Sequence, residues 1–156
     1  MSDITEIAFD DIDGINALAS EDFGEFGPAV EITQDMINTF ADVTGDHQWI
    51  HVDIEKANAG PFGGPIAHGF LTLSMVASMR TGDSFKITGV SNAVNYGADK
   101  LRFMAPVAAG SSIQARTRLL GAEQKSMGTL VKTETAIHVV DAEKPSLIYQ
   151  GLVLYM

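Results

Sequence analysis

The segment IAHGFLTLSMVASM, residues 66–79, is apolar on almost every side. A helix with this pattern is buried over most of its surface, because it has no polar face to present to water. His, Gly, Ser and Thr interrupt its apolar run well short of the roughly 20 residues that a membrane span requires. We expect the helix to end near Arg80 and Gly82 and to form the centre of a core that the rest of the chain encloses.

The chain after residue 85 changes to the period-two pattern of β-strands. Short turns separate the last three of five strand-like segments, which favours an antiparallel meander. An apolar helix followed by antiparallel strands indicates an α+β fold in which an antiparallel sheet wraps around a central apolar helix. The five segments are residues 90–97, 100–107, 112–120, 129–140 and 146–156.

The N-terminal residues predict an arm that packs on the main body. Ile12, Ile15 and Leu18 recur at helical spacing and have acidic residues around them, which is typical of a short amphipathic helix. We assign residues 1–22 to this arm. No repeat or linker interrupts the remainder, so the sequence predicts a single domain over residues 1–156.

Local signals also place the next elements. Residues 24–32 are expected to form a first strand. Thr33 is a good N-cap and Gly45 a good stop, so a helix is expected between them. Asp46 then falls just past the C-terminus of that helix, and His51 lies in the loop beyond it.

The composition excludes several classes of protein. The 156 residues contain no cysteine, which rules out disulfides and thiolate chemistry. The formal net charge is −10 and the ten Lys and Arg residues are scattered, so nucleic acid is not expected as a partner. The acidic N-terminus lacks the basic region of a signal peptide, and no segment predicts a membrane span. These features favour a cytoplasmic protein.

Asp46 and His51 are the first candidates for catalysis. A carboxylate and an imidazole that lie close together can divide the work on one water molecule, with one taking a proton and the other supplying one. Partial burial shifts both pKa values toward neutrality, as that work requires. The spacing alone is equally consistent with Asp46 as a turn residue and His51 as a packed loop histidine.

His68 and Gly69 stand at the expected start of the apolar helix. A helix N-terminus presents free N–H groups, and Gly69 has no side chain to keep a carbonyl away from its own N–H. Such a donor stabilises an enolate or oxyanion. The alternative is that Gly69 only allows close contact between helix and sheet. The more common role for a histidine such as His68 is structural.

No metal or other cofactor is expected. His51, Asp53 and His68 could form a set of two histidines and one carboxylate, but their spacing matches no familiar ligand motif. The chain contains neither the GxSxG motif of serine hydrolases nor the GxxxxGK[ST] motif of phosphate-binding loops.

Two segments, FADVTGDHQWIHVD at residues 40–53 and PIAHGFL at residues 65–71, together carry a family signature. They resemble the motifs of the MaoC-like (R)-specific enoyl-CoA hydratases, which have the hot-dog fold. Gln48-Trp49 replaces the Asn-Pro pair of the family motif, as in a branch that resembles nodulation protein N. Residues 95–107 also resemble that branch.

The resemblance implies roles for the matching residues. Asp46 and His51 would hold the water that adds to a trans-2-enoyl-CoA thioester, with His51 mainly as base and Asp46 handling the proton for the α-carbon. The Gly69 N–H would receive the thioester carbonyl. The resemblance also implies a homodimer. The side chains expected to bind or line the substrate are those of Phe62, Ile66, His68, Asn95 and Tyr96.

Two other functions stay open on the sequence. A hot-dog acyl-CoA thioesterase would hydrolyse the thioester, usually through water assisted by a carboxylate or Gln, and the Asp46–His51 loop favours a hydratase over it. A non-catalytic module that binds acyl thioesters would keep the same loop only as structure.

Overall fold

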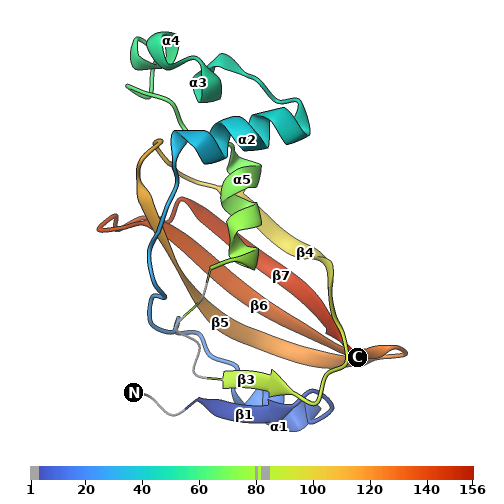
Figure 1. The fold of residues 1–156 in the computed structure, drawn as a ribbon. Helices are drawn as coiled ribbons and strands as arrows, with labels where there is room; N and C mark the ends of the chain where they lie inside the picture. Colours follow the sequence, from blue (N-terminus) through green and yellow to red (C-terminus); the bar gives the residue numbers. More distant parts are fainter. Residues whose placement is uncertain (1–3, 80, 82–84) are drawn as a thin grey trace.

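A five-stranded antiparallel sheet forms the main layer of the molecule (Figure 1). The structure is a computed structural model that describes residues 4–79, 81 and 85–156. Along the sheet the strand order is β2-β5-β6-β7-β4, and the last three strands in sequence form the predicted meander. The strands are β2 (Val30–Glu31), β4 (Ala93–Phe103), β5 (Ser112–Lys125), β6 (Gly128–Val139) and β7 (Leu147–Tyr155).

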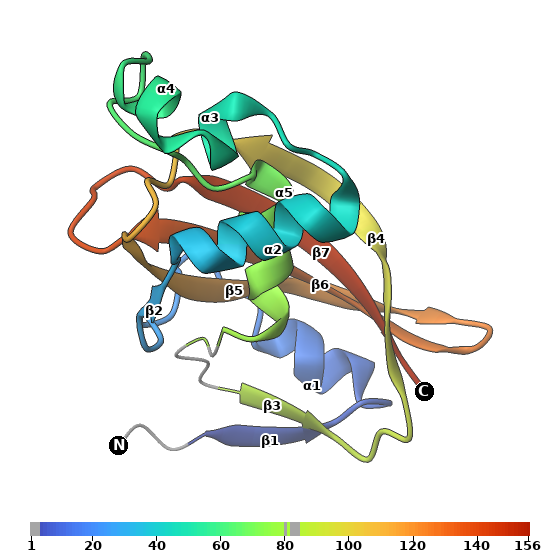
Figure 2. The ribbon, with the colours of Figure 1, turned by 45° about the horizontal axis from the view of Figure 1, so that its top comes forward.

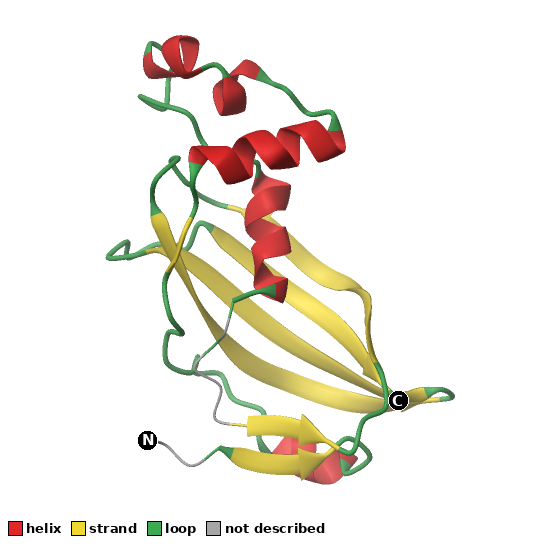
Figure 3. Ribbon diagram, viewed as in Figure 1, coloured by secondary structure: helices red, strands yellow, loops and turns green. Residues whose placement is uncertain are grey.

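The apolar segment forms the helix α5 (Gly69–Ser74), which lies across one face of the sheet (Figure 3). A 3₁₀ turn, Met75–Ala77, continues it. The α+β plan, with a helix held against an antiparallel sheet, is therefore confirmed. Arg80 and Gly82, where the helix was expected to end, lie outside the described residues.

The helix begins three residues later than the apolar pattern suggested. Residues 66–68 are extended instead, because they pair with a second extended segment: the Ala67 N–H donates to the Val107 carbonyl at 2.8 Å, and Ile66 forms a bridge with Ala108. This pairing places His68 at the N-cap of α5 and Gly69 in its first turn.

One side of α5 is open, although the sequence predicted burial over most of its surface. Leu71 and Thr72 are buried, whereas Phe70 is 62% exposed. Ser74 and Ala77 follow one and two turns later on the same side and are also exposed. This side faces β4, which is an edge strand whose residues are almost all exposed.

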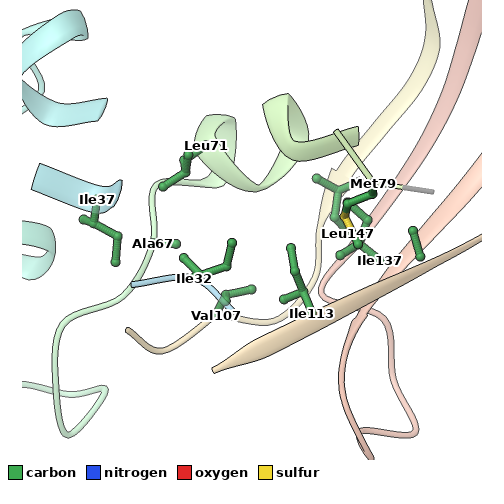
Figure 4. Close-up of a cluster of buried hydrophobic side chains, with 10 residues drawn as sticks. Ile32, Ile37, Ala67, Leu71, Met79, Val107, Ile113, Ile137 and Leu147 are labelled. Atoms are coloured by element: carbon green, nitrogen blue, oxygen red, sulfur yellow. The ribbon is translucent and has the colours of Figure 1, made fainter. Parts of the chain in front are cut away.

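The largest core cluster fills the space between α5 and the sheet (Figure 4). Inward-facing residues of β5, β6 and β7 meet side chains from α2 (Gln34–Thr44), from the segment before α5 and from α5 itself. The alternation predicted for the strand segments is confirmed at Ile113, Ala115 and Leu119, which are buried. The cluster consists of Ile32, Ile37, Ala67, Leu71, Met79, Val107, Ile113, Ala115, Ile137 and Leu147.

The N-terminal residues cover the far end of the sheet. The predicted amphipathic helix is α1 (Ile12–Ala17), whose Ile15 is buried in a second cluster with Leu119 and Val131. A two-stranded parallel pair, β1 (Thr5–Ala8) with β3 (Phe85–Thr88), lies beside α1 (Figure 2). The sequence analysis did not predict this pair.

Two strand predictions are corrected by the structure. The segments 90–97 and 100–107 are not separate strands, because β4 runs through both with register shifts near Gly97 and before Lys100. The expected strand at 24–32 is regular only at Val30–Glu31. Gly24 and Gly27 donate single hydrogen bonds to β5 carbonyls, and Pro28 has no N–H with which to continue the ladder.

The helix α2 has the predicted ends. The Thr33 hydroxyl accepts a hydrogen bond from the Met36 N–H, and Gly45 closes the helix with a left-handed backbone, φ 77°. Two short helices follow, α3 (Trp49–Val52) and α4 (Ile54–Asn58). His51 therefore lies on a helical turn and not in an open loop. Figure 2 shows α2 crossing over α5, with α3 and α4 beyond it.

Candidate active site

His51 is held in one tautomer by the main chain. Its ring is buried, with 6% exposure, and its Nδ1 lies 2.7 Å from the carbonyl oxygen of Ile66. A carbonyl can only accept, so the proton is on Nδ1 and the neutral ring keeps a free lone pair on Nε2. The short helix α3 and the extended residue Ile66 thus prepare an imidazole that can take up a proton at Nε2.

The surroundings of His51 keep it neutral. Burial lowers the pKa of His51 below its ordinary value, and the neighbouring His68 lowers it further. The Ile66 carbonyl and the Asp46 carboxylate act in the opposite direction, without reversing the shift. The unprotonated form, which a general base requires, is therefore favoured near neutral pH.

Asp46 lies on the exposed turn after α2. Its main chain follows the left-handed Gly45, and its Oδ1 accepts a 3.3 Å hydrogen bond from the Gln48 N–H. A side-chain oxygen of Asp46 and a ring nitrogen of each of His51 and His68 all lie within 4.8 Å of one another. Asp46 is thus both a turn residue and a neighbour of His51 and His68. The two interpretations that the spacing left open are therefore compatible.

His68 contacts both His51 and Asp46. Its ring, 3% exposed, stacks on His51 with 3.9 Å between centroids and 25° between planes. Its Nε2 lies 2.9 Å from the main-chain oxygen of Asp46, while its Nδ1 has no partner among the described residues. The resemblance implied that His68 binds the substrate, and in the structure its ring lies against His51 and the main chain of Asp46.

The same three residues fit a metal ion poorly as they stand. Zinc bonds of about 2.0–2.2 Å require ligand atoms closer together than the 4.8 Å that this group spans. Asp53, which the sequence analysis weighed as a third ligand, instead caps α4 by accepting a hydrogen bond from the Lys56 N–H.

Gly69 lines a cavity of about 270 Å³ between α5 and the segment after β4. As the first residue of α5, its N–H has no acceptor within the helix. Phe62 and Ile66, both predicted as lining residues, join Gly69 in the wall. The remaining wall residues are Ala67, Thr72, Phe103, Met104, Ala105, Pro106, Val107 and Ser146.

Other predicted lining residues lie elsewhere. Asn95 and Tyr96 border a separate, wider hollow near the other end of α5, together with Ser74 and Ala77. Asp46 and His51 are not part of the wall of the Gly69 cavity. The sequence analysis did not single out Phe103, because alternation along a strand does not reveal which residue passes the start of a helix.

The family model for the MaoC like domain matches residues 21–141. The chain belongs to the MaoC-like family. This MaoC-like chain is 43% identical over 149 residues to 3-hydroxyacyl-thioester dehydratase Z of Mycobacterium tuberculosis, covering 95% of this chain and 97% of that protein. It is also 41% identical over 120 residues to nodulation protein N of Rhizobium leguminosarum, covering 76% of this chain and 74% of the relative.

Solved structures agree with this assignment. The (R)-hydratase from A. caviae involved in PHA biosynthesis superposes with a TM-score of 0.67 at 18% sequence identity, covering 86% of this chain and 97% of that one. The MaoC-like chain thus has the hot-dog fold, and it is an enzyme of the hydratase and dehydratase type, a lyase. Within the described residues, every helix is too short or too polar to cross a membrane.

Proposed function

We propose that this MaoC-like enzyme catalyses the (R)-specific hydration of trans-2-enoyl-CoA to 3-hydroxyacyl-CoA, or the reverse dehydration. The observation that carries the proposal is the hydrogen bond from His51 Nδ1 to the Ile66 carbonyl, which leaves Nε2 free beside Asp46. The name of the mycobacterial relative supports the substrate class, because it describes a dehydratase of 3-hydroxyacyl thioesters.

In the hydration direction, His51 Nε2 accepts a proton from the water, and the water oxygen bonds to C3 of the enoyl group. The electrons of the double bond move toward the thioester carbonyl, whose oxygen gains negative charge. The Gly69 N–H donates to that oxygen and stabilises the enolate. The proton taken up by His51 then passes through Asp46, which also polarises the water, to C2. His51 returns to its neutral form, and one water is consumed per double bond.

The acyl group is proposed to occupy the cavity beside Gly69. Phe62 and Ile66 give its wall an apolar surface, and the thioester carbonyl then lies next to the start of α5. Asp46 and His51 lie outside that wall, but Ile66, whose carbonyl accepts from His51, is part of it. The reacting double bond is therefore expected at the rim of the cavity, beside Ile66.

We further propose that the enzyme is a homodimer that joins through β4. This edge strand is eleven residues long and carries Val94, Tyr96 and Phe103 with large exposed surfaces. An open edge of this length normally needs a cover. The exposed side of α5, with Phe70 against the Phe103 ring, continues the same apolar surface.

The absorbance of the enoyl group of crotonyl-CoA separates the proposed function from its alternatives. Loss of that absorbance without release of free thiol supports hydration. Release of thiol supports the thioesterase instead. Purified protein that leaves short, medium and branched enoyl-CoA substrates unchanged, yet binds them, is a binding module and contradicts the proposal.

A further inference from the structure

We propose that His68 is a positioning residue that holds Asp46 and His51 together, so that the carboxylate and the imidazole act on the same water. This inference rests on the proposed hydratase function and adds to it a residue that touches neither water nor substrate. The contacts of His68 with Asp46 and with His51, and the tautomers that they require, lead to the proposal.

The first contact fixes Asp46. The turn that carries this residue is exposed, and the other hydrogen bonds of Asp46 itself are long: 3.4 Å from the Asp46 N–H to the Thr44 hydroxyl and 3.3 Å from the Gln48 N–H to Oδ1. The bond from His68 Nε2 to the Asp46 carbonyl is 2.9 Å and comes from a buried ring. It therefore ties the main chain of Asp46, and with it the residue that carries the carboxylate, to a buried side chain.

The second contact fixes the ring of His51. The carbonyl of Ile66 accepts from its Nδ1, and the imidazole of His68, two residues later, stacks on its face. The extended segment 66–68 thus contacts the His51 ring in the ring plane, through the Ile66 carbonyl, and on one face, through His68. Phe40 packs against His68 from α2, with 4.9 Å between the ring centroids, and keeps the second ring in place.

The hydrogen bonds of the two rings require opposite tautomers. His68 must carry its proton on Nε2 to donate to the Asp46 carbonyl, whereas His51 carries its proton on Nδ1. The neighbouring His68 also lowers the pKa of His51 and so opposes its protonation. The ionisable side chains that act on His51 from its neighbouring elements are His68 and Asp46.

Two substitutions test the hydrogen-bond donor and the ring of His68 separately. His68→Phe keeps a flat ring for His51 and Phe40 but has no donor for Asp46, and His68→Gln keeps an N–H near the position of Nε2 but has no ring. We expect kcat of His68→Phe to fall by about 10²-fold with little change in KM, since a shift of about 1 Å in a catalytic group costs that much. His68→Gln is expected to recover most of that loss.

A second measurement does not depend on turnover. The titration of the His51 ring, followed by NMR in the resting protein, is expected to move to higher pH in both variants, because a neutral side chain replaces an imidazole that opposes its charge. A residue that served only to fill space would leave this titration where it is. If His68→Phe fails to fold, His68→Leu removes the same donor with a smaller side chain.

Different results contradict the positioning role of His68 and the proposed hydratase function. Wild-type kcat in His68→Phe, or an equal loss in the Phe and Gln variants, overturns the positioning role. Wild-type protein without hydration activity contradicts the proposed function instead. In that case the titration of His51 alone tests the positioning role. An unchanged His51 midpoint in both variants overturns that role.

Discussion

The ring of Phe103, on β4, covers the α-carbon of Gly69 at the start of α5. A Cβ added at Gly69 would lie 2.9 Å from two of the ring carbons of Phe103, which is closer than real Cβ contacts allow. Glycine is therefore required here for a close approach, both by this ring and by any carbonyl that binds at the Gly69 N–H.

Gly69→Ala is expected to lower kcat/KM by about 10²-fold, since the new methyl group displaces either the Phe103 ring or the thioester by about 1 Å. Stability should change little, because alanine favours a helix and the partly exposed Phe103 ring can move. Steady-state kinetics and a thermal melt measure both effects.

Gly64→Ala is the matched control, because the nearest atom to its new Cβ is the Asn58 Oδ1 at an ordinary 3.5 Å. It should behave like the wild type. A Gly69→Ala enzyme with unchanged kcat/KM would show that the carbonyl does not bind at this residue.

Removal of either member of the proposed catalytic pair should cost at least about 10²-fold in kcat, the lower end of the effect of a positioned acid or base. Asp46→Asn and His51→Ala test this in the crotonyl-CoA assay. Circular dichroism checks that both variants are folded. His47→Ala, an exposed histidine on the same turn that pairs with Asp42, is the control and should keep its rate. Near-normal turnover in Asp46→Asn or His51→Ala would remove that residue from the mechanism.

The pH dependence of kcat/KM should report His51 as the base. Because burial lowers the pKa of His51, the unprotonated form persists below the usual histidine value of about 6.5. We therefore expect kcat/KM to stay level as the pH falls through about 6.5 and to decrease only at lower pH. An acid limb centred above pH 6.5 would contradict the shift and point to another group.

The same shift affects stability with a definite sign. Between the lowered pKa in the folded protein and about 6.5 in the unfolded chain, the unfolded chain binds more protons, so acid favours unfolding in this window. The free energy of unfolding should fall as the pH is lowered through the window. Denaturant melts of His51→Gln, compared with wild type at each pH, should show a smaller loss.

The homodimer can be tested at the open side of α5. Phe70→Asp places a charge on this apolar surface and should raise the dimer dissociation constant at least about tenfold, as expected for an interface residue worth more than 1 kcal/mol. Met127→Asp adds the same charge at an equally exposed residue in the β5–β6 turn and should have no effect. Light scattering measures the oligomeric state of both variants. A wild-type monomer at micromolar concentration would contradict the dimer.

Much of the fold follows from local rules that a sequence displays directly. Thr33 and Gly45 bound α2 because one side chain satisfies a free N–H and one backbone adopts a positive φ. The alternation in β5 sets which of its side chains face the core. The parallel pairing of β1 with β3 could not be predicted in this way, since it joins Thr5 to Phe85 across most of the chain.

The sequence by itself determined that Asp46 and His51 are near each other and that a helix starts close to Gly69, because each depends on residues within a few positions. Only the tertiary structure decided that His68 stacks on His51, that Ile66 selects its tautomer and that Phe103 covers Gly69. These contacts join segments that are distant along the chain or meet only across an extended segment. Burial and main-chain pairing over the whole fold select them, and no local periodicity encodes that selection.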